Sequence, residues 1–186
     1  MAAIMLDFDN YPIIAAVRSD EDLEAALKYD VQTIFLLNSG IMTIDSVLKK
    51  GHDAGKLIFV HLDFIQGISN DAPGVKFLAT KGIDGIISTR ANIISAAHDC
   101  GIDSVQRFFM IDSRSVETAL ETIRASRASM VEIMPGIAFK SIEKIKRNVR
   151  IPIIAGGLIE HTEEVFKALS HGASAVSTGK RELWGE

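Results

Sequence analysis

The sequence predicts a compact (β/α)8 barrel of the TIM type, formed by residues 1–186 as a single domain. Short apolar runs rich in Ile, Val, Phe and Ala alternate with longer amphipathic segments along the whole chain, which is the pattern of β–α repetition. No Pro-rich or Ser-rich linker interrupts this alternation. Eight strands separated by seven helices are typical of a closed barrel rather than of an open doubly wound sheet.

The first four strands are expected at the apolar runs 13–17, 33–37, 57–62 and 85–88. Helices are expected between and after them, at 20–29, 43–52, 74–81 and 91–100. The first helix opens with Ser19, Asp20, Glu21 and Asp22, so a capping hydroxyl is followed by acidic side chains at the positive end of the helix dipole.

The remaining strands are expected at 106–111, 130–133, 152–155 and 173–177. The helices that follow them are expected at 114–126, 141–148 and 162–171. The last of these opens with Thr162, Glu163 and Glu164, again with acidic side chains at the positive helix end. Glycines are expected just past the ends of four helices, where a left-handed backbone is favoured, at positions 51, 82, 101 and 172.

The length of the chain is the main argument against a barrel. Barrels of this type typically need about 250 residues and about 200 at the low end, whereas this chain has 186. A barrel therefore requires very short loops, and an open parallel sheet remains the alternative.

The composition excludes several classes of protein. Hydrophobic residues make up 47% of the chain, yet no apolar run is long enough for a membrane helix. The opening MAAIMLDFDN has acids where a secretory signal has positive charge, so a cytoplasmic protein is expected. The single Cys100 fits a packed side chain better than a nucleophile. A net charge of −4 argues against a globally basic nucleic-acid binder but leaves room for a local basic patch.

Two predicted turns carry residues suited to binding an anion. Gly156 and Gly157 follow the seventh strand, and the eighth is followed by Ser-Thr-Gly-Lys from residue 177. Phosphate commonly sits on backbone N–H groups after the seventh and eighth strands of such barrels. The two turns therefore predict a phosphate cradle at Gly156, Gly157, Ser177, Thr178 and Gly179. The alternative is that the glycines only permit a tight turn and that Ser-Thr caps a final short helix.

Other polar residues stand at the predicted carboxyl ends of strands and would ring the same mouth. Glu132 lies between Val131 and Ile133, so it needs either a ligand hydroxyl or an ion pair with Arg90 or Arg107. Asn38 and its neighbour Ser39 end a predicted strand, where they could cap the next helix or form hydrogen bonds with a polyol. The candidates for contacting a polyol are Asn38, His61, Asp63, Arg90, Asp112 and Glu132.

Catalysis has little support in the sequence. A phosphate-sugar isomerase, epimerase or aldolase fits a phosphate site, but Lys56 precedes its strand and Lys180 follows its own, so no Lys inside a strand could form a Schiff base. His61 and Asp63 make a poor metal pair without other His at strand ends. An acid/base pair among the carboxylates stays open. Binding without turnover, with no catalytic residue, metal or cofactor, is the simpler hypothesis.

Taken together, several runs resemble the glycerol-3-phosphate responsive antiterminator family, which regulates glycerol uptake operons. They are PIIAAVRS, IFLLNSGI, FVHLDFIQGIS with Asp71 and Lys76 beyond it, DGIISTR, QRFFMIDS, VEIMPG, PIIAGGLI and AVSTGKRELW. The resemblance implies a non-enzymatic barrel that binds glycerol-3-phosphate and acts on messenger RNA leaders, letting polymerase read through a terminator. It places the phosphate at Gly156, Gly157, Ser177 and Thr178, and the glycerol hydroxyls near some of Asp63, Arg90, Asp112 and Glu132. Gly179 departs from the second Ser expected in the family.

The RNA partner rests on the resemblance more than on the residues. The densest basic run is Lys140, Lys144, Lys146, Arg147 and Arg150, and three of these share one helix face. A solvated helix face is the alternative, and no run of interleaved aromatic residues suited to stacking RNA bases is visible. The expected partners are a small phosphorylated ligand and an mRNA leader, without a membrane, and a homo-oligomer stays open.

Overall fold

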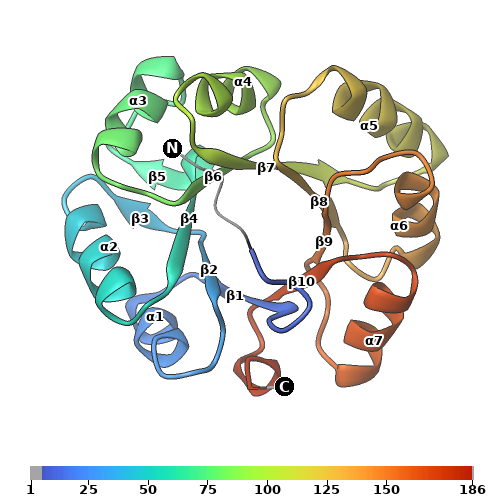
Figure 1. The fold of residues 1–186 in the computed structure, drawn as a ribbon, viewed down its shortest axis with the longest axis horizontal. Coiled ribbons are helices and arrows are strands. Elements are labelled where there is room, and N and C mark those ends of the chain that lie inside the picture. Colours follow the sequence, from blue (N-terminus) through green and yellow to red (C-terminus); the bar gives the residue numbers. More distant parts are fainter. Residues whose placement is uncertain (1–5, 186) are drawn as a thin grey trace.

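The computed structural model describes residues 6–185, and its centre is a closed barrel of parallel strands (Figure 1). The barrel closes because β1 pairs with β10, with Ile13 opposite Val176. The closed order β1-β10-β9-β8-β7-β6-β4-β2 confirms the predicted barrel and excludes the open sheet. Its strands are β1 (Ile13–Val17), β2 (Thr33–Leu36), β4 (Leu57–His61), β6 (Gly85–Ser88), β7 (Asp103–Phe109), β8 (Met130–Met134), β9 (Ile153–Gly156) and β10 (Ala175–Thr178).

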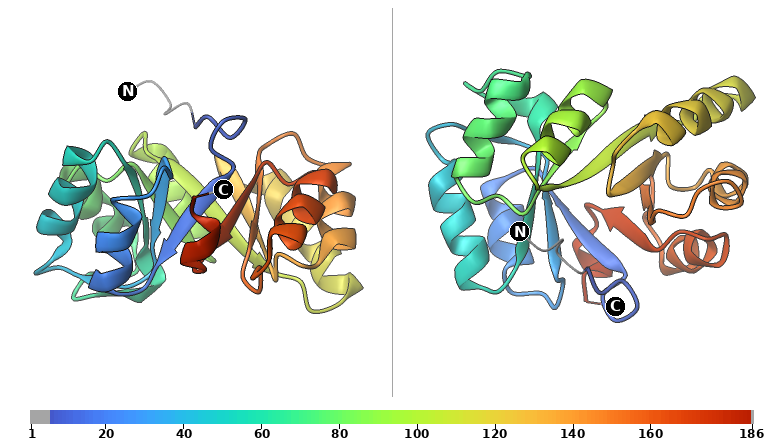
Figure 2. Two further views of the ribbon diagram at one scale, coloured as in Figure 1. Left: turned by 90° about the horizontal axis from the view of Figure 1, so that it is seen from below. Right: turned by 45° about the horizontal axis from the view of Figure 1, so that its top comes forward.

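Helices surround the barrel, and the side view and the tilted view both show them flanking it (Figure 2). Short helices fit the barrel into this chain, since α1 has only 7 residues and the longest, α5, has 13. The ring consists of α1 (Asp20–Ala26), α2 (Ile44–Asp53), α3 (Ala72–Thr80), α4 (Ala91–Asp99), α5 (Ser113–Ala125), α6 (Phe139–Lys146) and α7 (Thr162–Ser170). Two single-turn 3₁₀ helices, η1 (Leu62–Phe64) and η2 (Arg181–Leu183), follow β4 and β10.

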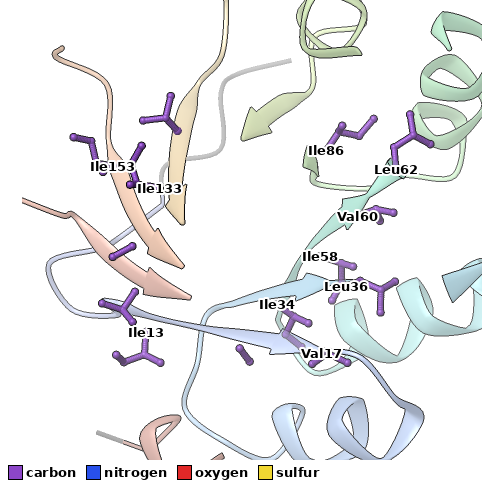
Figure 3. Close-up of a cluster of buried hydrophobic side chains, with 14 of the residues drawn as sticks. Ile13, Val17, Ile34, Leu36, Ile58, Val60, Leu62, Ile86, Ile133 and Ile153 are labelled. Atoms are coloured by element: carbon purple, nitrogen blue, oxygen red, sulfur yellow. The ribbon is translucent and has the colours of Figure 1, made fainter. Parts of the chain in front are cut away.

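The larger part of the core lies between the strands and the helices. Alternate residues of each strand point outward into this layer, as Ile34 and Leu36 of β2 do beside Ile58 and Val60 of β4 (Figure 3). These four side chains are at most 3% exposed, so the outward face of both strands is fully buried. Packing in this layer holds the strands in place, and with them the polar residues at their carboxyl ends.

A second, smaller cluster fills the inside of the barrel. It includes Phe35 and Phe59, whose ring centroids are 5.8 Å apart. Gly85 makes room for the second ring, because a Cβ there would lie 2.2 Å from Phe59. Leu6 and Phe8, from the segment before β1, also pack against this cluster. The inside of the barrel is therefore a packed core, and a cavity can form only at the end of the barrel.

The structure differs from the predicted elements in a few places. Strand β7 begins at Asp103 rather than at residue 106, and α6 begins at Phe139 rather than at 141. Two additional strands of two residues each, β3 (Ser39–Gly40) and β5 (Ile65–Gln66), pair in parallel outside the barrel. Their shortness leaves no periodic signal, because two residues cannot show an alternation.

One predicted helix end is wrong. Gly51 lies inside α2, where a Cβ would come within 2.6 Å of Ile58, so this glycine permits close packing of the helix on β4. The left-handed residue after α2 is Gly55, with φ 72°. Gly82, Gly101 and Gly172 do follow their helices with positive φ, as predicted.

His61, at the end of β4, is buried with only 2% of its surface exposed. Neither ring nitrogen has a hydrogen-bond partner among the described residues. Burial, together with the nearby positive charge of Arg107, lowers the pKa of His61 to about 4, while Asp63 acts in the opposite direction. The imidazole is therefore neutral in the folded protein at pH 7.

We predict that this histidine makes the fold acid-sensitive. Its pKa is about 6.5 in the unfolded chain and about 4 in the folded one, so between these values the unfolded state binds the additional proton. The contribution of His61 should lower the free energy of unfolding by about 3 kcal/mol as the pH drops through this window. Urea denaturation of the wild type and of His61→Gln at pH 7 and pH 4.5 measures this. An equally large fall in the variant would contradict the assignment.

Candidate functional site

A cavity of about 400 Å³ opens at the carboxyl ends of the strands. Its wall combines the loops after β9 and β10 with residues from β1, β7 and β8. Of the five predicted cradle residues, Gly157, Ser177, Thr178 and Gly179 line it, and Gly156 does not. The two turns that the sequence singled out thus face one common space.

The paired glycines have reasons within the protein itself. A Cβ on Gly156 would lie 2.1 Å from Oε1 of Glu132, so this position has to be bare for the Glu132 carboxylate to fit. Gly157 has φ 74°, and a Cβ there would meet Met134 at 2.7 Å. The need for glycine at position 157 is therefore explained by the tight turn, and the need for glycine at position 156 by the neighbouring carboxylate. Neither reason prevents the turn from offering N–H groups to a ligand.

The Thr178 hydroxyl ties the two turns together. It donates to the carbonyl oxygen of Ile159 at 2.8 Å and accepts from the N–H of Lys180 at 3.1 Å. The carbonyl of Thr178 in turn accepts from the indole Nε1 of Trp184 at 2.8 Å. The Thr178 hydroxyl is therefore already used, whereas the backbone N–H groups of Leu158 and Gly179 have no partner among residues 6–185.

Glu132 and Arg107 form a buried ion pair at the cavity, with Nε of Arg107 2.6 Å from Oε2 of Glu132. Their side chains are 1% and 7% exposed. Burial raises the pKa of Glu132, and the guanidinium of Arg107 and the hydroxyl of Ser177 oppose this rise. The ion pair predicted as an alternative for Glu132 therefore exists, with Arg107 and not Arg90 as its partner.

Arg18 is a cavity residue that the sequence-based reasoning missed. It follows β1 directly and lines the cavity, and its Nη1 lies 3.4 Å from where a Cβ of Gly179 would be. The other rim cation, Lys180, has its Nζ 3.7 Å from Glu160. Within the described chain, no carboxylate lies within 4 Å of the Arg18 guanidinium. The sequence did indicate this position, because Arg18 stands at the carboxyl end of a strand, as Arg90 does.

Asp63 organises the loop after β6. Its carboxylate accepts from Asn70 Nδ2 at 2.9 Å, Ser88 Oγ at 2.8 Å and the N–H of Thr89 at 3.0 Å. Burial would raise the pKa of Asp63, but these hydrogen bonds outweigh it, and the pKa is lowered. Arg90 is 3.9 Å from the same carboxylate. Both residues lie away from the lining of the 400 Å³ cavity.

The other predicted polyol contacts are also placed elsewhere. Asp112 caps α5, accepting from the N–H of Ser115 at 2.8 Å. Asn38 lines a neighbouring cavity of about 570 Å³, which shares Arg18 with the first. His61 is in the buried interior described above. Among the six candidates, Glu132 is the one that lines the cavity of the phosphate turns.

The basic run lies on and after α6, where part of its charge is already matched. Lys144 Nζ is 3.8 Å from Glu117 of α5, and Arg147 is paired with Glu143 one turn earlier. The stem of Lys146 covers Gly172, where a Cβ would lie 2.6 Å from it. Lys140 and Arg150 are exposed. The structure thus shows a partly neutralised basic face rather than five free cations.

Two features of the described residues bear on the other expectations. No helix within residues 6–185 is long and apolar enough to cross a bilayer. The same residues contain no group of three or more His, Cys, Asp or Glu side chains that could hold a metal ion.

Several known proteins are similar to this chain over nearly its whole length. The glycerol uptake operon antiterminator regulatory protein of Listeria monocytogenes is 35% identical, with a TM-score of 0.92 over 97% of this chain and 98% of that one. A glycerol uptake operon antiterminator-related protein of Thermotoga maritima is also 35% identical, with a TM-score of 0.85 over 95% and 99%. The uncharacterized protein YgcP of Escherichia coli K12 is 35% identical over 93% of this chain and 91% of its own.

More distant structures of barrel enzymes, among them an orotidine 5′-phosphate decarboxylase from Pyrococcus horikoshii at 16% identity and a TM-score of 0.67, share the fold alone. The family model described as glycerol-3-phosphate responsive antiterminator matches residues 13–184. This match covers nearly every element of the barrel and both turns of the cavity. The chain therefore belongs to the glycerol-3-phosphate responsive antiterminator family.

Proposed function

We propose that this protein is a cytoplasmic regulator that binds glycerol-3-phosphate at the barrel mouth and then binds an mRNA leader, promoting transcription antitermination of glycerol uptake genes. The observation that carries the ligand part is the unpaired cation Arg18 facing the same cavity as the free N–H groups of Leu158 and Gly179. Family membership supports the regulatory part. The proposal includes no cofactor, no metal and no chemical step.

The phosphate dianion belongs beside Arg18 and the loops after β9 and β10. Backbone N–H groups and a guanidinium are the donors that proteins commonly use for phosphate oxygens. Gly179 is not required for space, because a Cβ there would make ordinary contacts, 3.4 Å to Arg18 and 3.6 Å to the carbonyl of Ala16. The serine expected in the family would therefore fit at this position too.

The glycerol hydroxyls belong at the buried end of the cavity. There Glu132 offers carboxylate oxygens that accept hydrogen bonds, and Arg107 offers guanidinium N–H groups that donate them. A hydroxyl can do both, so it suits this pair better than an apolar tail does. This places the ligand with its phosphate at the rim and its polyol toward the barrel interior.

For RNA, the proposal uses exposed cations near α6 that form no ion pair with a described residue, chiefly Lys140 and Arg150. Glycerol-3-phosphate can promote RNA binding only if it binds more tightly to the RNA-competent state than to the other state. The two states differ in conformation or in oligomeric state.

A small enzyme acting on a phosphorylated polyol or sugar is the second candidate. One observation favours it: a buried carboxylate with a raised pKa, Glu132, lies in the cavity, and such groups are common in active sites. Incubation with glycerol-3-phosphate followed by NMR of the ligand decides between them, because turnover supports the enzyme and an unchanged ligand supports the regulator.

We predict that glycerol-3-phosphate stabilises the protein through Arg18. A ligand at about 100 times its Kd adds about 2.7 kcal/mol, which raises the Tm of a domain of this size by about 5 to 10 °C. Arg18→Gln should weaken binding by about 10- to 100-fold, because a charge-assisted hydrogen bond is lost.

Differential scanning fluorimetry and calorimetric titration measure both effects. Arg90→Gln is the matched control, since Arg90 also follows a strand but lies outside the cavity. Glycerol without phosphate should give no comparable shift. An unchanged Tm with glycerol-3-phosphate, or an equal loss in both variants, would contradict the proposed site.

We predict that RNA binding depends on the exposed cations near α6 and on the ligand. In a gel-shift assay with the leader of the glycerol operon, glycerol-3-phosphate should increase the affinity. The double variant Lys140→Gln/Arg150→Gln should bind more weakly, with the slope of log K against log salt reduced by about 2.

The charge-matched control is Lys49→Gln/Lys76→Gln, on α2 and α3 across the ring from α6 (Figure 1). An equal loss of RNA affinity in the control would show that only net charge matters. An RNA affinity that is the same with and without glycerol-3-phosphate would contradict control by the ligand.

A further inference from the structure

The charges that line the cavity are nearly balanced before any ligand enters. Three cations, Arg18, Arg107 and Lys180, stand against two anions, Glu132 and Glu160. Arg107 is paired with Glu132 at 2.6 Å, and Lys180 lies 3.7 Å from Glu160. The charge left for a ligand is therefore that of Arg18. A phosphate dianion already exceeds it, so the cavity has no cation in reserve for a second negative group.

The two anions occupy very different positions. Glu160 lies at the rim, with 56% of its side chain exposed, whereas the Glu132 side chain is 1% exposed. Glu132 is also fixed in place, because Arg107 holds Oε2 and Oε1 lies against the bare Cα of Gly156. Solvent screens the charge of Glu160, whereas a ligand beside the buried pair meets the Glu132 carboxylate and the Arg107 guanidinium with little screening.

The buried pair suits a neutral hydroxyl. Nε of Arg107 is taken by Glu132, and the two terminal nitrogens of the guanidinium carry further N–H donors. A hydroxyl between them and the carboxylate would donate to one side and accept from the other. A ligand carboxylate has no proton to donate and would face a buried carboxylate of the same charge.

We propose that Glu132, positioned by Arg107 and Gly156, determines the specificity of the cavity: it admits phosphomonoesters with a neutral, hydroxylated tail and excludes phosphorylated carboxylic acids. This inference rests on the proposed function, since it assumes that the phosphate sits at the rim and the tail at Glu132. Beyond the proposed function, the inference names the class of ligand that does not bind and the residue that excludes it.

The first test uses the wild-type protein and three ligands. Glycerol-3-phosphate and 3-phosphoglycerate differ by a hydroxymethyl group in place of a carboxylate, and inorganic phosphate has no tail. Calorimetric titration should give a Kd for 3-phosphoglycerate that is at least about 100-fold higher than that for glycerol-3-phosphate. Comparable affinities for the two would overturn the proposal.

The second test removes one negative charge at either of two positions in the cavity and compares the two variants. Glu132→Gln should reduce the preference for glycerol-3-phosphate over 3-phosphoglycerate by at least about 10-fold. The matched control Glu160→Gln adds the same charge at the exposed rim, so it should change the affinities for both ligands by similar factors. A loss of selectivity as large in Glu160→Gln as in Glu132→Gln would overturn a specific role for Glu132.

A third variant guards against misfolding, because removing one partner of a buried pair leaves a lone charge behind. Arg107→Met/Glu132→Leu removes both charges and should keep the fold, as checked by circular dichroism, while losing the selectivity. The failures are distinguishable. If neither inorganic phosphate nor glycerol-3-phosphate binds the wild type, the proposed function and this inference both fail. If phosphate binds and both organic ligands bind equally, only this inference fails.

Discussion

The ion pair between Arg107 and Glu132 is the constraint around which the barrel mouth is built. It joins neighbouring strands, β7 and β8, and its two side chains are only 7% and 1% exposed. Its presence explains why β9 ends in a glycine, because no side chain fits between Gly156 and the Glu132 carboxylate. Well-packed apolar residues could stabilise the fold equally well at such positions. The pair is therefore better explained by what it does at the cavity than by its contribution to stability.

The rim of the cavity is held by a separate set of contacts. Thr178 links the turn after β9 to the turn after β10, and Trp184, only 1% exposed, bonds to the same residue from the C-terminal side. Arg181 fastens this segment to α1 through Asp22 at 2.7 Å. Burial would raise the pKa of Asp22, but the hydrogen bonds from Arg181 and Ser19 outweigh this effect and lower it. The turns are thereby preorganised, which reduces the entropy lost when an anion is bound.

The barrel and the location of its mouth could be predicted from the sequence because both depend on local patterns. Apolar runs mark the strands, and the residue after each run marks the edge. The roles of individual side chains could not be predicted, because they depend on partners far away in the chain. Asp63 was singled out as a ligand contact, but its bonds to Asn70, Ser88 and Thr89 could not be inferred from the sequence. Gly51 looked like a helix end, although its neighbour Ile58 on the next strand is what requires it.

Closure of the barrel also sets the moment at which the site first exists. Arg18 follows the first strand and Gly179 follows the last, and only the β1–β10 seam brings them together. During synthesis, the nascent chain therefore cannot assemble this cavity until its final strand has left the ribosome and found the first one, a pairing of very high sequence separation. A ligand bound between these two ends contacts both strands of the seam. Its binding therefore opposes the separation of β1 from β10, which is the step that would open the barrel.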